Sequence, residues 1–158
     1  MAKLRAKPGE VYEIPLSGGS FGYVKCLPYG EYAFLNYQSA QKLENVEVLK
    51  SAETLFRIWV MNYAFNKNSS WKRIGVLELN EDEKRGSDFF KQDQLSGRLT
   101  IYREAQDNPA GYEERPATLE ECRGLERAAV WNPEHVEDRL SDYFSGIENK
   151  WVKSLALK

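Results

Sequence analysis

Hydrophobic and polar residues alternate along the first part of the chain. In EVYEIPL, residues 10–16, the apolar side chains of Tyr12, Ile14 and Leu16 would share one face of a strand, with Glu13 on the other. A second apolar run, FGYVKCL, begins at residue 21 after a Gly-Gly centre. Because glycine readily adopts the positive φ of tight turns, the two runs predict a β-hairpin.

Similar runs continue to the middle of the chain. Strands are predicted near residues 10–16, 21–28, 31–37, 55–64, 71–79 and 98–103. Residues 41–53 are more polar, and we expect at most one helical turn there, around NVEVLKS. Residues 80–97 and 104–117 mix both charge signs with turn-forming residues, which predicts two long loops, the first anchored by Phe89 and Phe90.

The last third of the chain is expected to be helical. Thr118 and Glu121 form the T-x-x-E pattern of a capping box before a short helix. A longer helix, near 133–145, would begin at Asn132-Pro133 and end at Gly146. Its apolar residues recur at helical spacing and are Val136, Leu140, Tyr143 and Phe144. The final KWVKSLAL is expected to be a strand or an extended tail.

Together these elements predict an α+β fold. We expect residues 1–158 to form a single domain, a curved and mainly antiparallel sheet with one or two C-terminal helices packed against it. Aromatic residues, at 13%, favour such a sheet-rich core. The basic N-terminus is not followed by an apolar run, and Cys26 and Cys122 lack metal-ligand spacing. These features are typical of a cytoplasmic protein with two reduced thiols.

Charge is distributed unevenly along the sequence. The net charge is -2, but residues 80–158 contain 12 basic and 17 acidic residues. Between Glu104 and Glu148, twelve acidic residues accompany only four arginines. The sequence has no basic patch, so nucleic acid is not an expected partner, and no apolar run is long enough to span a membrane.

The candidates for catalytic chemistry are weak. In LSGGSFGYVKC, Gly19, Gly22 and Val24 match the later positions of a kinase glycine-rich loop, but Ser17 replaces the first glycine. The lysine strand, the catalytic loop and the Asp-Phe-Gly segment of a kinase are absent, so the glycines indicate a turn. His135 is the one histidine, which excludes a multi-histidine metal site. A thiolate pair of Cys26 with His135 stays open, without local support.

Two further site types remain as alternatives. Adjacent acids such as Glu113/Glu114 could serve a glycosidase-type mechanism if two of them faced each other across a cleft, although such pairs are usually solvated. An aromatic series could form a stacking platform for a small ligand or glycan, or could simply fill the core. Its members are Phe21, Tyr23, Tyr29, Tyr32, Phe34 and Tyr37.

The N-terminal segment KPGEVYEIPLSGGSFGYVKCL resembles the signature of the immunity protein 26 family of bacterial polymorphic toxin systems. The matching residues are Lys7, Gly9, Glu10, Val11, Ile14, Pro15, Leu16, Gly19, Gly22 and Val24. WKRIGVLEL also resembles the family's Trp-x-x-Ile-Gly strand through Trp71, Ile74 and Gly75. FFKQDQLSGRLTIYR and LERAAVWNPEHVEDRL are similar to segments of longer members.

The resemblance implies an α+β immunity protein that neutralises a bacterial effector toxin by binding it. It implies no catalytic residue, cofactor or metal, and a protein that is a monomer or a weak homodimer. The family is also grouped with a small organophosphate triesterase, which makes a small hydrolase the alternative function. A binding module for a small ligand is a third possibility.

The acidic segment is the candidate contact with such a toxin. Toxins that attack nucleic acid are usually cationic, and a complementary negative surface accelerates association. The predicted partner-binding residues are Glu120, Glu121, Glu134, Glu137, Asp138 and Asp142. The alternative is a solvated helix surface that contributes only solubility.

Overall fold

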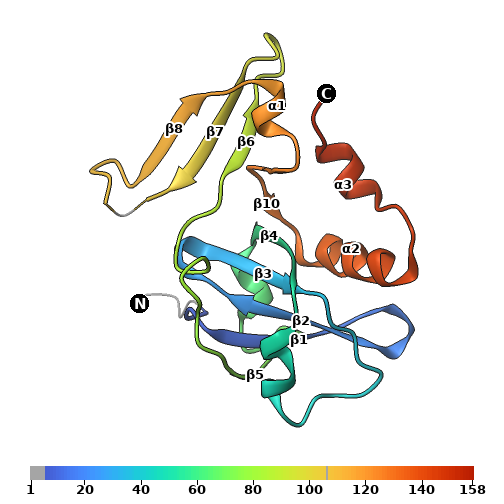
Figure 1. The fold of residues 1–158 in the computed structure, drawn as a ribbon. Coiled ribbons are helices and arrows are strands. Elements are labelled where there is room, and N and C mark those ends of the chain that lie inside the picture. The colour runs from blue at the N-terminus through green and yellow to red at the C-terminus, as the bar shows by residue number, and fades with distance from the viewer. Residues whose placement is uncertain (1–5, 106) are drawn as a thin grey trace.

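The computed structural model describes residues 6–105 and 107–158, which form two β-sheets and three α-helices (Figure 1). The larger sheet has the strand order β10-β4-β3-β2-β1-β5. Its strands are β1 (Glu10–Pro15), β2 (Phe21–Cys26), β3 (Glu31–Leu35), β4 (Thr54–Val60), β5 (Lys72–Val76) and β10 (Val130–Trp131). All neighbours in this sheet are antiparallel except β10 and β4, which are parallel.

The smaller sheet lies above the larger one in Figure 1 and has the order β8-β7-β6-β9. Its strands are β6 (Phe89–Gln92), β7 (Leu99–Glu104), β8 (Tyr112–Pro116) and β9 (Glu126–Arg127). The strand predicted near 98–103 therefore forms, as β7, but in this second sheet. Short 3₁₀ helices lie at Ser17–Gly19, Pro28–Gly30, Val46–Ser51 and Asn62–Phe65 (η1 to η4).

Each helix begins at a residue whose side chain caps it. α1 (Leu119–Cys122) begins with the predicted capping box of Thr118 and Glu121. α2 (Pro133–Ser145) has the predicted ends: the Asn132 side chain accepts a hydrogen bond from the backbone N–H of Glu134, and Gly146 is left-handed, with φ 71°. α3 (Lys150–Leu155) starts at Asn149, whose side chain accepts from two backbone N–H groups. The prediction that KWVKSLAL is extended is therefore wrong.

The α+β class is confirmed, and the two long loops need correction. Residues 80–97 contain β6, a strand too short to show alternation, in which Phe89 and Phe90 are both buried as expected. Residues 104–117 contain β8, whose five residues are all exposed. An edge strand with no buried face has no hydrophobic pattern to predict it. The strand predicted at 55–64 ends at Val60 and the one at 71–79 spans Lys72–Val76.

Helix α2 packs directly on the larger sheet. Val136 and Leu140 are fully buried and belong to a core cluster that includes Phe34, Ile58 and Trp71. A Cβ atom at Gly22 would lie 3.2 Å from Cδ1 of Leu140, so a glycine in β2 gives the helix room to approach the sheet. This packing fixes which face of α2 is turned outward. No helix among the described residues is long and apolar enough to cross a membrane.

Candidate partner-binding site

The six predicted partner-binding residues lie in two separate places. Glu134, Glu137, Asp138 and Asp142 are on α2, whereas Glu120 and Glu121 are on α1, beside the smaller sheet. Figure 1 shows α1 near the top of the molecule and α2 lower, alongside the larger sheet. We call the four carboxylates of α2 the acidic face. The structure brings these four together and leaves the α1 pair apart from them.

Two members of the acidic face accept hydrogen bonds from residues that lie between β4 and β5. Glu134 is exposed, and its Oε2 accepts from the Tyr63 hydroxyl at 3.0 Å. Glu137 is half-buried, and its Oε2 accepts from Nε1 of the buried Trp71 at 2.8 Å. Both donors are neutral. The bonds hold the carboxylates in place without cancelling their charge.

The other two members are held by the C-terminal segment. Asp138 is exposed and accepts from Nε1 of Trp151 at 3.2 Å. Asp142 accepts from Nδ2 of the buried Asn149 at 2.9 Å. Within residues 6–105 and 107–158, no Lys, Arg or His forms an ion pair with any of the four. The acidic face therefore presents ordered carboxylates that form no ion pair within the described residues.

The basic residue of α2 is directed elsewhere. Arg139 forms a bidentate pair with Glu126 of β9, at 2.8 and 2.9 Å, and its guanidinium lies 3.5 Å from the centre of the Phe56 ring. His135 stacks on Trp151, with ring centres 3.6 Å apart. Arg139 is thus paired at the sheets and does not pair with the four carboxylates of the acidic face.

The α1 carboxylates are neutralised within the chain. Glu120 pairs with Arg123 at 2.9 Å, and Glu121 pairs with Arg115 at 2.8 Å while completing the capping box. The backbone N–H of Thr118 and the Arg115 guanidinium lower the pKa of Glu121. Both residues therefore have a local role in stabilising the start of α1, and they contribute little free negative charge.

The crowding of charges on α2 affects the protonation of Glu137. Partial burial raises the pKa of Glu137, and the neighbouring carboxylates of Glu134 and Asp138 raise it further. The hydrogen bond from Trp71 acts in the opposite direction. Burial and the neighbouring carboxylates thus both disfavour the charged form of Glu137.

The candidates for catalysis are not assembled into a site. Cys26 and Cys122 are both free and buried, and burial raises the pKa of each thiol. His135 is stacked on Trp151 rather than near a nucleophile, so the Cys26–His135 pair is not formed. Among the described residues, no group of three or more His, Cys, Asp or Glu side chains could hold a metal ion.

The aromatic series does not form the stacking platform considered as an alternative. Tyr23, Tyr32 and Phe34 are buried in the core, and Phe21 and Tyr37 pack against it. β-strand alternation placed these rings on both faces of the sheet, each covered by other elements. Tyr29 alone of the series lines a cleft. The other five aromatic residues of the series therefore do not form a ligand-binding surface.

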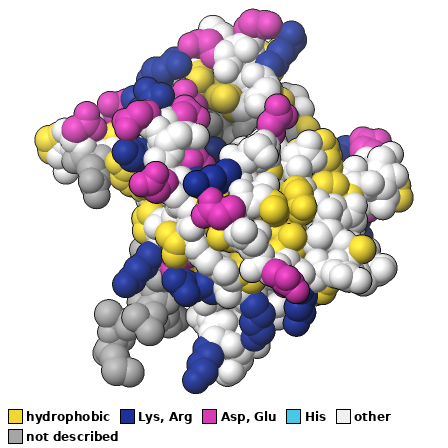
Figure 2. Space-filling view, turned by 60° about the horizontal axis from the view of Figure 1, so that its bottom comes forward, with side chains coloured by type: hydrophobic (Ala, Val, Ile, Leu, Met, Phe, Trp, Pro, Cys, Tyr) yellow, Lys and Arg dark blue, Asp and Glu magenta, His cyan; other side chains and the backbone are white. Residues whose placement is uncertain are grey.

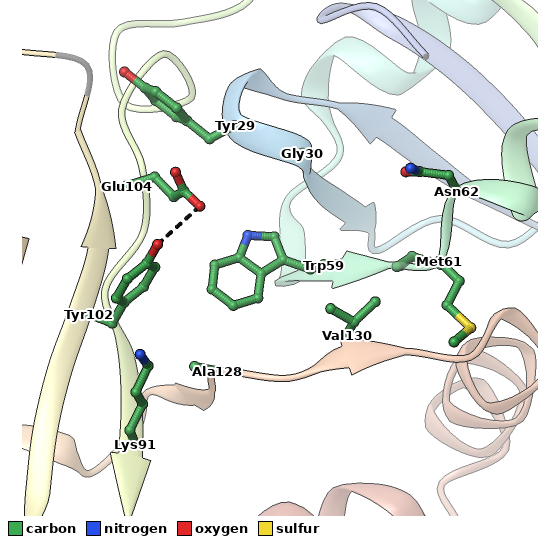
Figure 3. A pocket seen from close by; sticks show the side chains of 11 residues that line it. Tyr29, Gly30, Trp59, Met61, Asn62, Lys91, Tyr102, Glu104, Ala128 and Val130 are labelled. Carbon is green, nitrogen blue, oxygen red and sulfur yellow. Dashed lines mark hydrogen bonds between the residues drawn. The ribbon is translucent and has the colours of Figure 1, made fainter. Parts of the chain in front are cut away.

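A cleft of about 510 Å³ lies between the two sheets, and sequence reasoning missed it (Figure 3). Trp59 and Met61 line it from the end of β4, Tyr102 and Glu104 from β7, and Tyr29 from the turn before β3. In Figure 3 the Trp59 ring lies between Tyr102 and Val130, with Glu104 and Tyr29 above. No local pattern predicts this site, because it depends on how the two sheets meet.

Surface charge outside the cleft is mixed. On the face shown in Figure 2, Lys and Arg side chains gather along the lower edge, while Asp and Glu lie mostly on the upper half. The exposed ion pairs of the smaller sheet, such as Arg103–Glu113 at 2.6 Å and Lys91–Glu114 at 2.9 Å, contribute to this mixture. The acidic face of α2 differs from them because its carboxylates have no cationic partners.

The comparisons with known proteins identify the family. The family described as Immunity protein 26 matches residues 7–100, from the segment before β1 into the start of β7. No curated protein and no solved structure matches the chain. The acidic face of α2 lies outside the matched residues, so its assignment depends on geometry and charge alone. The matched segment covers more than half of the 158 residues, and the chain belongs to the immunity protein 26 family.

Proposed function

We propose that this immunity protein neutralises a cognate effector toxin by stoichiometric binding, and that the acidic face of α2 contacts the toxin. Family membership supports the immunity role. The observation that supports the contact is that Glu134, Glu137, Asp138 and Asp142 are held by neutral donors and form no ion pair within the described residues.

This arrangement suits a cationic partner. Toxins that act on nucleic acid need positive charge to approach their substrate, and a fixed negative surface on the inhibitor accelerates association with such a protein. The hydrogen bonds from Tyr63, Trp71 and Trp151 restrict the carboxylates before binding. Less side-chain entropy is then lost when the complex forms.

The test uses the cognate toxin, to be sought among the neighbouring genes, and a double charge reversal, Glu134→Lys with Asp138→Lys. These two side chains are exposed, whereas Glu137 and Asp142 bind the buried Trp71 and Asn149 and are left intact. We expect association at least about tenfold slower, with weaker salt dependence, loss of protection in cells and only a small fall in the melting temperature, from the loss of Glu134 in the first turn of α2.

A matched control reverses the charge of two exposed acids that lie outside α2, as Glu44→Lys with Glu53→Lys. This variant has the same net charge as the test variant, and it should associate and protect nearly as the wild type does. Equal losses in both variants would show that only net charge matters. Unchanged kinetics and protection in the α2 variant would place the contact elsewhere, with the β6–β7 turn and the β7–β8 loop as the next surfaces to examine.

Neutralisation of the α1 residues separates the two halves of the predicted site. Because Arg123 and Arg115 already neutralise Glu120 and Glu121, substitution of these acids by Gln should change association much less than the α2 reversal. An equally large effect would show that α1 is part of the contact.

A further inference from the structure

The cleft between the sheets is walled by aromatic rings from separate elements. Trp59 of β4 and Tyr102 of β7 meet edge to face, with ring centres 5.8 Å apart, and Tyr112 of β8 stacks on Tyr102 at 5.2 Å. Tyr29 lines the upper end of the cleft in Figure 3. The faces of aromatic rings attract cations, most strongly where water is partly excluded.

A cation of the chain itself already lies against one of these rings. The ammonium group of Lys91 is 4.3 Å from the centre of the Tyr102 ring. Lys91 is held there by Glu114, at 2.9 Å, on the outer strand β8. Its charge is therefore matched by Glu114, a carboxylate that does not line the cleft, and a second carboxylate lies on the cleft wall itself.

That second carboxylate is Glu104. Its hydrogen-bond donor is the neutral Tyr102 hydroxyl, at 3.2 Å, and it forms no ion pair with any residue in 6–105 or 107–158. Figure 3 shows the carboxylate between Tyr29 and Tyr102, across from the Trp59 ring. A half-buried carboxylate surrounded by rings is the arrangement that binds an ammonium or guanidinium group.

Tyr29 lines the cleft from a turn in which its backbone is left-handed. Tyr29 has φ 66°, and it is the one residue other than glycine with positive φ in the described chain. A left-handed conformation is unfavourable for a bulky side chain, and such strain is found disproportionately at functional sites. On the opposite rim, Met61 and Val130 are 46% and 60% exposed, which leaves apolar surface available to a partner.

The cleft is continuous with the acidic face of α2. The backbone N–H of Met61 donates to the carbonyl of Trp131, and Asn132 then caps α2. Two residues beyond Met61, the Tyr63 hydroxyl donates to Glu134 of the acidic face. A protein bound to the acidic face would therefore also lie over the mouth of the cleft.

We propose that the cleft binds one lysine or arginine side chain of the toxin, with the cation against Glu104 and beside the rings that line the cleft, those of Tyr29, Trp59 and Tyr102. This inference rests on the proposed function for the identity of the partner. A cationic side chain buried among aromatic rings would anchor the complex, while the acidic face attracts the toxin from a distance.

The cleft can be tested without the toxin, using the N-acetyl amide of arginine as the probe. Three of the four tryptophan indole N–H groups report on the places of interest. That of Trp59 reports on the cleft, and those of Trp71 and Trp151 report on the acidic face through their hydrogen bonds to Glu137 and Asp138. We expect saturable shifts of the Trp59 signal in an NMR titration, and none with the N-acetyl amide of norleucine. Trp59→Phe assigns the signal.

Two variants test the named groups. Glu104→Gln keeps an acceptor for Tyr102 but removes the charge, and should weaken probe binding about tenfold. Tyr29→Asn removes the ring at a position where asparagine tolerates positive φ, and should also weaken binding. Glu53→Gln, at an exposed acid outside the cleft, is the control and should bind the probe as the wild type does.

The outcomes separate the two proposals. Shifts of Trp71 and Trp151 without Trp59, or no saturable shift, would overturn the cleft proposal and leave the toxin-binding test of the acidic face intact. Tighter binding of spermidine than of the arginine probe would overturn the assignment to a protein side chain. With the toxin present, Glu104→Gln should accelerate dissociation of the complex, whereas the α2 reversal should slow its association. An unchanged dissociation rate in Glu104→Gln would also contradict the cleft proposal.

Discussion

The carboxylate of Glu31 in β3 is completely buried and pairs with Arg57 of β4, at 2.9 Å between Oε2 and Nη2. The same carboxylate accepts hydrogen bonds from the backbone N–H and the hydroxyl of Ser87, at 2.7 and 2.8 Å. Arg57 in turn donates to the backbone carbonyls of Asp82 and Arg85. The pair therefore fastens the connection between β5 and β6, and with it the smaller sheet, to the larger one.

Replacement of Glu31 by Gln should destabilise the protein by about 3 kcal/mol, because the largely buried guanidinium of Arg57 would keep only the exposed Asp82, 3.7 Å away, as a counter-charge. The measurement is the free energy of unfolding from urea denaturation. Loosening of the connection should also alter the cleft, so the Trp59 indole signal is expected to shift in this variant.

The control for Glu31 is the exposed pair Lys84–Glu81, in the same connection. Glu81→Gln should leave the unfolding free energy unchanged within error, since exposed pairs are screened by water. Similar losses in the two variants would mean that burial of Glu31 does not determine the strength of its ion pair.

Helix α2 should depend on Leu140, which is fully buried against Gly22 of β2. Leu140→Ala is expected to cost about 3 kcal/mol, and Leu140→Asp, which buries a charge without a partner, should prevent folding. Thermal melting followed by circular dichroism measures both. Tyr143→Asp is the control on the same helix, since Tyr143 is half exposed. A stable Leu140→Asp protein would contradict the packing of α2.

The sequence predicts α2 well because its signals are local. Asn132, Pro133 and Gly146 mark its ends, and Val136 and Leu140 lie at helical spacing on one side. β8 carries no such signal, because all its side chains are exposed and its position depends on pairing with β7. The second sheet could not be inferred for the same reason: pairing between distant segments, such as β6 with β9, leaves no pattern in either strand.

Only the part of the candidate site that depends on local spacing could be predicted from the sequence. The four acids of α2 share a surface because of helical spacing, which the sequence shows directly. Their donors Tyr63, Trp71 and Trp151 come from distant segments, and nothing local indicates those bonds. The pairing of Glu121 with Arg115 likewise depends on the position of β8, so the sequence overstates the free charge of α1. The cleft depends wholly on how the sheets meet.

An organophosphate triester assay tests the hydrolase alternative. We expect turnover equal to that of heat-denatured protein, with or without added zinc, cobalt or manganese. The physical reason is that Cys26 is buried with a raised pKa and that the described residues hold no group of three or more potential metal ligands. Turnover that disappears in His135→Ala or Cys26→Ala would overturn the assignment to binding alone.

Substitution of Glu137 by Gln should change how stability depends on pH. The pKa of Glu137 is raised in the folded protein, by burial first and then by Glu134 and Asp138. As the pH falls from neutral through that raised pKa, the folded state binds a proton before the unfolded chain does, so the contribution of Glu137 to stability increases. Glutamine keeps an acceptor for Trp71 and carries no charge at any pH. Glu137→Gln should therefore melt about 2 °C higher than the wild type at pH 7, with the difference vanishing near pH 4.

The control is Glu134→Gln, at an exposed acid in the first turn of α2. This variant should lower the melting temperature slightly at pH 7, because it loses a favourable interaction with the helix dipole. A gain for Glu137→Gln that persists at pH 4 would show that the charge of Glu137 is not its cause.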